Sequence, residues 1–178
     1  MKKSILTLLV TSLLISCNSS VDTEIKFSKD TIGYEVQDDG TKVPLYGGDM
    51  SNIAVLESYI KAHNDRDLET IKSLNGDKDF KVYGPDGQVI EGSQAHIDFL
   101  ANWFEEASPK WVTNYLIENE LTNNKGELRQ WVTSGHEVTL TVDGEDVKFG
   151  QVIDARISEG KVQMFYVTQR VLAADELE

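Results

Sequence analysis

Cysteine is nearly absent from this sequence, because Cys17 is the only one among 178 residues. No disulfide can form within one molecule, which excludes the small disulfide-stapled scaffolds found among secreted proteins. With 40% hydrophobic residues, a chain of this length has enough apolar side chains for one core of ordinary size. We therefore expect a single folded domain that is stabilised by its core alone.

Basic residues are also scarce. The chain has 17 Lys and Arg against 30 Asp and Glu, which gives a net charge of −13. Nucleic acids and anionic membrane surfaces attract proteins through positive faces, so neither is expected to bind this chain by its charge. The acidic residues are scattered rather than gathered in one block, which is typical of a solvated surface.

Motifs for metals, phosphates and cofactors are missing as well. The three histidines are His63, His96 and His136, and no two have the four-residue spacing that places zinc ligands on one helical face. The sequence contains no phosphate-binding glycine loop, no nucleophile elbow and no complete calcium loop. We accordingly predict neither a metal nor a cofactor.

The apolar run over residues 5–15 is too short to cross a bilayer as a helix. It follows Lys2 and Lys3 and has the form of a signal peptide. Leu14-Ile15-Ser16-Cys17 then resembles the lipobox of bacterial lipoproteins, in which the cysteine is lipidated and becomes the mature N-terminus. The resemblance implies an anchor at Cys17 in the bacterial cell envelope, with the outer membrane as the expected site. The alternative is an ordinary secretory signal with a stray cysteine.

The composition predicts four parts of the chain. Residues 1–16 form the signal peptide, residues 17–48 a tether, residues 49–173 the folded domain and residues 174–178 an acidic tail. Removing residues 1–16 takes away Lys2 and Lys3, which leaves 15 basic against 30 acidic residues. In the tether, alternating Ile32, Tyr34 and Val36 suggest a short hairpin that turns at residues 38–40.

The folded domain begins with a pair of predicted helices. Residues 51–74 have two amphipathic stripes separated by a turn at residues 64–67, where Asp67 is placed to cap the second helix. Short extended segments follow, and a third helix is predicted from Ser93, its expected cap, to Ser108. The pattern then alternates, which predicts four strands at residues 110–121, 127–142, 146–158 and 161–172. This order indicates an α+β fold with helices on one face of an antiparallel sheet.

Three short patterns occur in an informative order. They are Tyr59-x-x-x-His63-Asn64-Asp65-x-Asp67-x-x-x-Ile71, then Val89-x-x-Gly92-x-x-x-Ile97, and finally Gly160-Lys161-Val162. Together they resemble the nuclear transport factor 2-like superfamily, and within it the SnoaL-like and ketosteroid isomerase-like proteins, over residues 52–172. The resemblance implies a cone-shaped α+β barrel in which three N-terminal helices pack in a strongly bent antiparallel sheet. Members use the pocket at the mouth for catalysis or for binding, so the fold does not decide the function.

The resemblance to ketosteroid isomerases extends to single residues. Tyr59 stands where those enzymes have a tyrosine that donates to a substrate oxyanion, and Asp154 matches the aspartic acid that assists it. Where they have an aspartate base, this sequence has Tyr83 or Gly84. A tyrosine with a pKa of about 10 is a poor base at neutral pH, so steroid isomerisation by that mechanism is not expected. Alternation also places Asp154 on the solvent side of its strand unless a bulge turns it inward, and Tyr59 could equally be a core residue.

Further candidates are a histidine pair and several aromatic residues. His136 lies in the middle of a strand and could serve as an acid, a base or a polar anchor, with His96 as its partner; each could instead be satisfied within the core. The residues expected to contact a ligand are Tyr83, His96, Trp103 and Trp131.

Two classes of function follow from these candidates. The preferred one is a lipid-anchored SnoaL-like pocket domain that binds a small apolar or amphipathic molecule or acts as an assembly module. The alternative is a cofactor-free isomerase, dehydratase or cyclase that uses Tyr59, His136 and Asp154. The missing aspartate base favours the first class. The resemblance also implies a homodimer that forms through the sheet.

Overall fold

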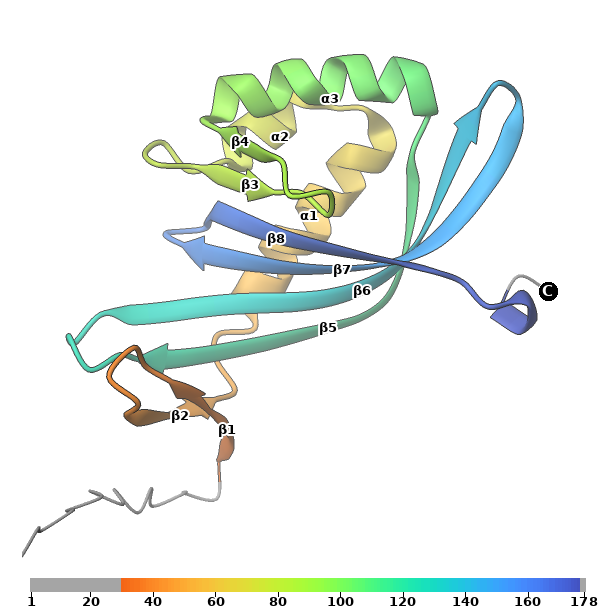
Figure 1. Ribbon diagram of the computed structural model, residues 1–178. Helices are drawn as coiled ribbons and strands as arrows, with labels where there is room; N and C mark the ends of the chain where they lie inside the picture. The colour runs from red at the N-terminus through yellow and green to blue at the C-terminus, as the bar shows by residue number, and fades with distance from the viewer. Residues whose placement is uncertain (1–29, 177–178) are drawn as a thin grey trace, which may run out of the picture.

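Three helices pack on one face of a strongly curved sheet of eight strands (Figure 1). The computed structural model describes residues 30–176, so the predicted signal peptide and Cys17 lie outside the described part. The chain is α+β, as its sequence predicts. Its elements are, in order, β1 Thr31–Val36, β2 Lys42–Tyr46, α1 Ser51–Asp65, α2 Leu68–Leu74, β3 Lys81–Tyr83, β4 Val89–Glu91, α3 Ser93–Ala107, β5 Lys110–Thr122, β6 Leu128–Val142, β7 Glu145–Ser158, β8 Lys161–Val171 and the short 3-10 helix η1 Ala174–Glu176.

The sheet is not purely antiparallel. Its strand order is β1-β2-β5-β6-β7-β8-β3-β4, and all neighbours are antiparallel except β3 and β8, which run parallel with Lys81 opposite Met164. The expectation of an antiparallel sheet is corrected at this one place. The physical reason is the connection: α1 and α2 lie between β2 and β3, so the short β3–β4 hairpin reaches the far edge of the sheet instead of joining β2. The helices also follow a hairpin rather than opening the domain.

The two predicted helix caps have different outcomes. The Asp67 carboxylate accepts from the backbone N–H of Thr70 at 3.0 Å, which confirms the predicted cap of α2. Ser93 is not the cap of α3, because Gly92 occupies that position with φ of 92° and no side chain caps the helix. The positive φ turns the chain from β4 into α3, and the Ser93 hydroxyl instead accepts from Asn75 Nδ2 at 2.9 Å.

The core lies between the helices and the inner face of β6, β7 and β8. Leu56 of α1 and Ile71 of α2 are fully buried against Val132, Ala155 and Val162 on successive strands. Alternation along each long strand therefore places one row of side chains in this core and the other row on the outer face of the sheet. Among residues 30–176, no helix has both the length and the apolar character needed to cross a membrane.

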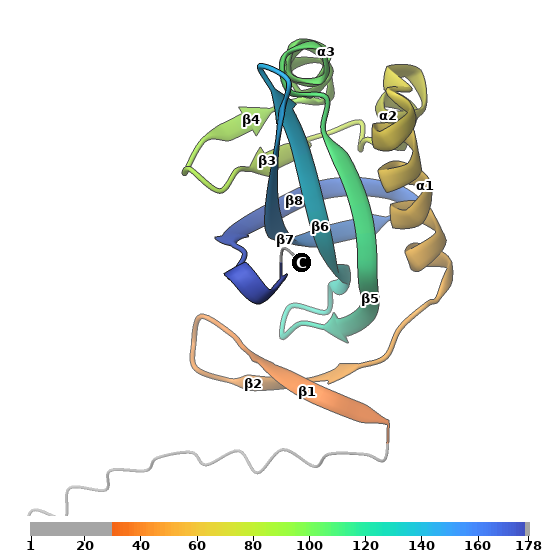
Figure 2. The same ribbon diagram turned by 90° about the vertical axis from the view of Figure 1, so that its right-hand side faces the viewer.

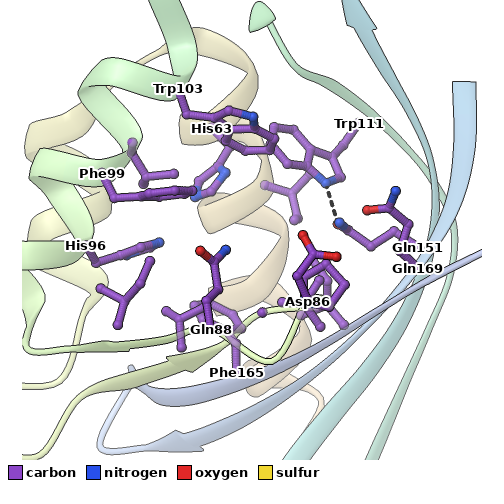
Figure 3. A pocket seen from close by; sticks show the side chains of 18 of the residues that line it. His63, Asp86, Gln88, His96, Phe99, Trp103, Trp111, Gln151, Phe165 and Gln169 are labelled. Carbon is purple, nitrogen blue, oxygen red and sulfur yellow. Dashed lines mark hydrogen bonds between the residues drawn. The ribbon is translucent and has the colours of Figure 1, made fainter. Parts of the chain in front are cut away.

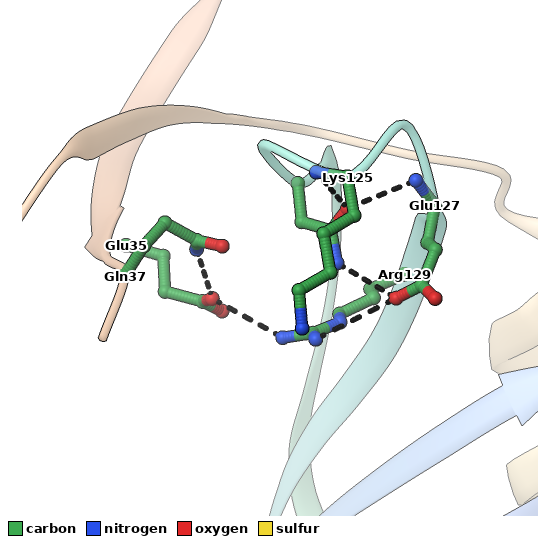
Figure 4. Close-up of polar contacts among 6 residues, drawn as sticks. Glu35, Gln37, Lys125, Glu127 and Arg129 are labelled. Carbon is green, nitrogen blue, oxygen red and sulfur yellow. Dashed lines mark hydrogen bonds and ion pairs between the residues drawn. The ribbon is translucent and has the colours of Figure 1, made fainter. Parts of the chain in front are cut away.

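The hairpin of β1 and β2 lies at the end of the sheet away from α3 (Figure 2). A single residue pair, Tyr46 with Glu120, joins β2 to β5. Arg129 of β6 adds an ion pair to Glu35 of β1 at 3.5 Å and contacts Glu127 at 3.8 Å (Figure 4). The hairpin is therefore attached to the domain mainly through polar contacts at one end of the sheet.

Candidate functional site

A cavity of about 340 Å³ lies between α1, α3, the inner face of β7 and β8, and the turn that joins β3 to β4. Its walls are mostly apolar and rich in aromatic rings (Figure 3). The rings come from Phe99 and Trp103 of α3, Trp111 at the start of β5, Phe149 of β7 and Phe165 of β8. A concave site with apolar walls and a few polar groups is the usual form of a small-molecule pocket.

His63 is the most unusual group in the cavity wall. It lies near the end of α1, is only 8% exposed, and neither of its ring nitrogens has a hydrogen-bond partner within the described residues. Its ring contacts Trp111 and Phe104 edge to face, at centroid distances of 5.0 and 5.6 Å. Burial, then the charges of His96 and Arg66, hold its pKa well below the ordinary value. His63 is therefore a neutral imidazole in the cavity wall, with one unpaired donor and one unpaired acceptor that are both buried.

Tyr59, one turn before His63, belongs to a closed polar network. Its hydroxyl donates to Asn75 Oδ1 at 2.5 Å and lies 3.4 Å from His96 Nδ1. Burial raises the pKa of Tyr59 well above its usual range and lowers that of His96 to about 4. Since the one phenolic proton is held by Asn75, Tyr59 orients its neighbours more than it offers a free donor to a ligand.

Polar side chains gather at the mouth of the cavity. Asp86 and Gln88 come from the β3–β4 turn, and Gln151 and Gln169 from adjacent positions of β7 and β8. Trp111 Nε1 donates to Gln151 Oε1 at 2.8 Å. Because an indole nitrogen can only donate, this contact fixes the orientation of the amide and leaves the NH₂ of Gln151 as a donor. The mouth thus combines one carboxylate with three neutral amides.

His136 lies on the inner face of β6 but outside this cavity. It is 2% exposed, with Nδ1 3.2 Å from Thr113 Oγ1 and Nε2 2.7 Å from Ser134 Oγ. Burial lowers its pKa to about 4. Both nitrogens are engaged, so the side chain has no free group for a ligand. His96, its expected partner, lies beside Tyr59 instead.

Tyr83, Trp131 and Asp154 lie on the outer face of the sheet. The Tyr166 ring is stacked between Tyr83 and Trp131, with centroid distances of 4.8 and 5.9 Å. Asp154 accepts from Thr133 Oγ1 at 2.8 Å, and the register shift between β7 and β8 comes from the extra residue Gln163 in β8, so no bulge in β7 turns this carboxylate inward. Tyr59, His136 and Asp154 therefore occupy three separate places, whereas Tyr59, His96 and Trp103 share the cavity.

Several residues of the cavity were not candidates from the sequence. His63 could have been one, because it follows Tyr59 by four positions on the same face of α1. Gln151 also carried a signal, since it interrupts an otherwise apolar inner row between Phe149 and Ile153. Nothing in the sequence marks Asp86 as a site residue, because aspartate is common in turns with proline and glycine whether or not a ligand binds there.

Comparisons with known proteins give a fold but no family. No model of a protein family matches the sequence, and no curated protein matches it. One similar solved structure is an LEH-like epoxide hydrolase of M. tuberculosis, with a TM-score of 0.56 and 14% identity over 67% of this chain and 83% of that one. A candidate SnoaL-like polyketide cyclase of Jannaschia has a TM-score of 0.53 and 15% identity over 68% of this chain and 86% of its own. A candidate ketosteroid isomerase of Kribbella flavida has a TM-score of 0.53 and 15% identity over 69% of this chain and 80% of its own. At these identities the likeness shows the fold alone, which is that of the nuclear transport factor 2-like proteins.

Proposed function

We propose that this chain of nuclear transport factor 2-like fold is a lipid-anchored binding protein of the cell envelope. In this proposal its cone-shaped interior holds a small, mostly apolar molecule that carries at least one hydrogen-bonding group. The observation that carries the proposal is His63, whose ring lines a cavity of about 340 Å³ and whose two buried nitrogens lack partners in the described residues. A buried polar group without a partner costs about 1–3 kcal/mol, and a ligand hydroxyl or carbonyl would remove that cost.

The arrangement of the other candidates supports binding over catalysis. Asp86 is the only carboxylate among the described residues that line the cavity, and it lies on the β3–β4 turn rather than beside His63 (Figure 3). The described cavity lining thus provides no buried carboxylate that could act as a base beside Tyr59 or His63. The neutral histidines suit an uncharged group in the interior that both donates and accepts hydrogen bonds, and Asp86 leaves room for a cation only at the mouth.

Binding of 2-naphthalenemethanol, a flat apolar ring system with one hydroxyl, tests this proposal. We expect the probe to raise the melting temperature by several degrees, because a ligand at about 100 times its Kd stabilises the folded state by about 2.7 kcal/mol. It should also quench the fluorescence of Trp103 and Trp111, which line the cavity. The variant Trp131→Phe should retain this quenching, because Trp131 lies on the outer face.

Adjacent positions of β8 provide the control for that experiment. Val167→Phe fills part of the cavity and should abolish the shift, whereas Thr168→Phe adds the same ring to the opposite face of the strand and should leave it unchanged. An equal loss of binding in both variants, or no shift in any folded variant, would argue against the cavity as the site.

The membrane anchor is the second part of the proposal. It rests on the lipobox-like Leu14-Ile15-Ser16-Cys17. Several acyl chains on one residue hold a protein stably on a membrane, whereas one chain gives only marginal binding. Cys17→Ser is therefore expected to move the protein from the membrane fraction to the soluble fraction of cells. An unchanged membrane pool would refute the anchor without touching the binding function.

The outer face of the sheet suggests how two copies would associate. The stacked rings of Tyr83, Tyr166 and Trp131 lie there, and Tyr166 is 45% exposed. Aromatic side chains at the centre of a patch are typical of contacts between proteins. We propose that a homodimer uses this face, which leaves the cavity on the other side of the sheet open to ligand.

A further inference from the structure

We propose that the cavity selects its ligand by charge, and that the natural ligand is an organic amine whose ammonium lies against Asp86 while its flat apolar body fills the interior. This inference rests on the proposed binding function and adds the chemical class of the ligand.

The described lining of the cavity has no positive charge. No lysine or arginine is found among the lining residues of this described part of the chain. The two histidines are neutral, because burial lowers the pKa of His96 to about 4 and that of His63 well below its ordinary value. A carboxylate that entered would lose its water without meeting a counter-charge, which is strongly unfavourable.

The Asp86 carboxylate at the mouth of the cavity has no partner in the described part of the chain. Asp86 lies in the tight turn in which Gly84 N–H donates to the Gln88 carbonyl at 2.9 Å, and Gly87 has a φ of 79°. The nearby Lys81 is already paired with Glu91 at 2.7 Å across the same hairpin. Within residues 30–176 no hydrogen bond or ion pair engages the Asp86 side chain, and Figure 3 shows its carboxylate between Gln88 and the pair Gln151 and Gln169.

The walls of the cavity are rich in aromatic rings. The rings of Trp103, Trp111 and Phe165 line the cavity, and aromatic rings attract an ammonium through their π electrons and stack with a flat hydrocarbon. The net charge of −13 also draws cations toward the protein and repels anions at every distance within the Debye length. The site and the overall field therefore favour the same sign of ligand.

Three probes of one shape test the inference: 2-naphthylmethylamine, 2-naphthalenemethanol and 2-naphthoic acid, titrated at pH 7.5 and low salt with tryptophan fluorescence. We expect the amine to bind about threefold tighter than the alcohol, because an ammonium near an exposed carboxylate gains only a modest Coulomb attraction. The acid should bind at least about tenfold more weakly than the alcohol, since no cation receives it.

Asp86→Asn should remove the advantage of the amine, so that the ratio of the affinities for amine and alcohol falls to about one. The control is Asp143→Asn, which makes the same change in net charge in the β6–β7 turn, away from the cavity. Asp143→Asn should leave the order of affinities, with the amine bound most tightly and the acid most weakly, as in the original protein.

The outcomes separate the inference from the function on which it rests. Equal affinities for amine and alcohol, or an amine advantage that survives Asp86→Asn, would overturn the inference while the cavity keeps its binding role. Tightest binding of the acid would do the same. Failure of all three probes to bind the folded protein would overturn both.

Discussion

Replacing His63 with leucine is expected to raise the free energy of unfolding by about 1–2 kcal/mol, because it removes a buried polar group whose cost is about 1–3 kcal/mol. Leucine has a comparable size, can pack against Phe104 and Trp111, and is the better helix former for α1. The same change should weaken the binding of 2-naphthalenemethanol about tenfold, because the ligand loses its buried polar partner. A substitution that stabilises the fold while it removes binding would mark His63 as a residue kept for its ligand.

His136→Leu is the matched control for that change. Both histidines are buried and neutral, but both nitrogens of His136 are engaged, by Thr113 and Ser134. Leucine at this position would leave the fully buried Ser134 hydroxyl without its shorter hydrogen bond, so we expect a loss of about 1–3 kcal/mol. Urea denaturation at pH 7.5 measures both variants. A loss of stability in both would show that His63 already has a partner in solution, such as a bound water.

Acidification from about pH 6.5 to pH 4 is expected to lower the free energy of unfolding by several kcal/mol. The folded protein holds His96 and His136 at pKa values of about 4, whereas an unfolded histidine titrates near its ordinary 6.5. The unfolded state therefore takes up protons first as the pH falls, and stability is lost across this window and not above it. A difference of about 2.5 in pKa corresponds to about 3 kcal/mol for each histidine.

Urea denaturation at pH 7.5, 6.5 and 5.5 measures this effect above the range in which most carboxylates titrate. His136→Gln keeps a donor and an acceptor but no longer titrates, so it should reduce the slope of stability against pH by about one proton per molecule. Glu118 has the opposite effect on stability at low pH. Burial raises its pKa, so the folded state takes up this proton before the unfolded state does. A flat profile from pH 7.5 to 5.5 would mean that the histidines are solvated in the folded protein.

Local patterns predicted most of the fold. The four long strands β5 to β8 lie within two residues of their expected limits, because alternation and turn residues are encoded in neighbouring positions. The cap at Asp67 is equally local. The parallel pairing of β3 with β8 could not be seen in this way, since Lys81 and Met164 are brought together only by the path of the whole chain.

The site was harder to predict for a related reason. Helical spacing placed Tyr59 on a buried face, and the third helix brought His96 and Trp103 to the same cavity. Whether a buried polar group is free or satisfied, however, depends on its neighbours from other elements. The sequence gives no way to distinguish His63, which has no partner in the described residues, from His136, which is held by two hydroxyls. That difference decides which of the two can serve a ligand.

The parallel pairing of β3 with β8 determines when the cavity forms as the protein folds. The β3–β4 turn carries Asp86 and Gln88 to the mouth, yet β3 has no strand to join, other than β4, until β8 is in place. Closing so long a loop is entropically costly and slows folding, so this step comes after the local hairpins of β5 to β8. The mouth is thus among the last features to be assembled, and a chain that ends before β8 would lack both this pairing and the Phe165 wall of the cavity.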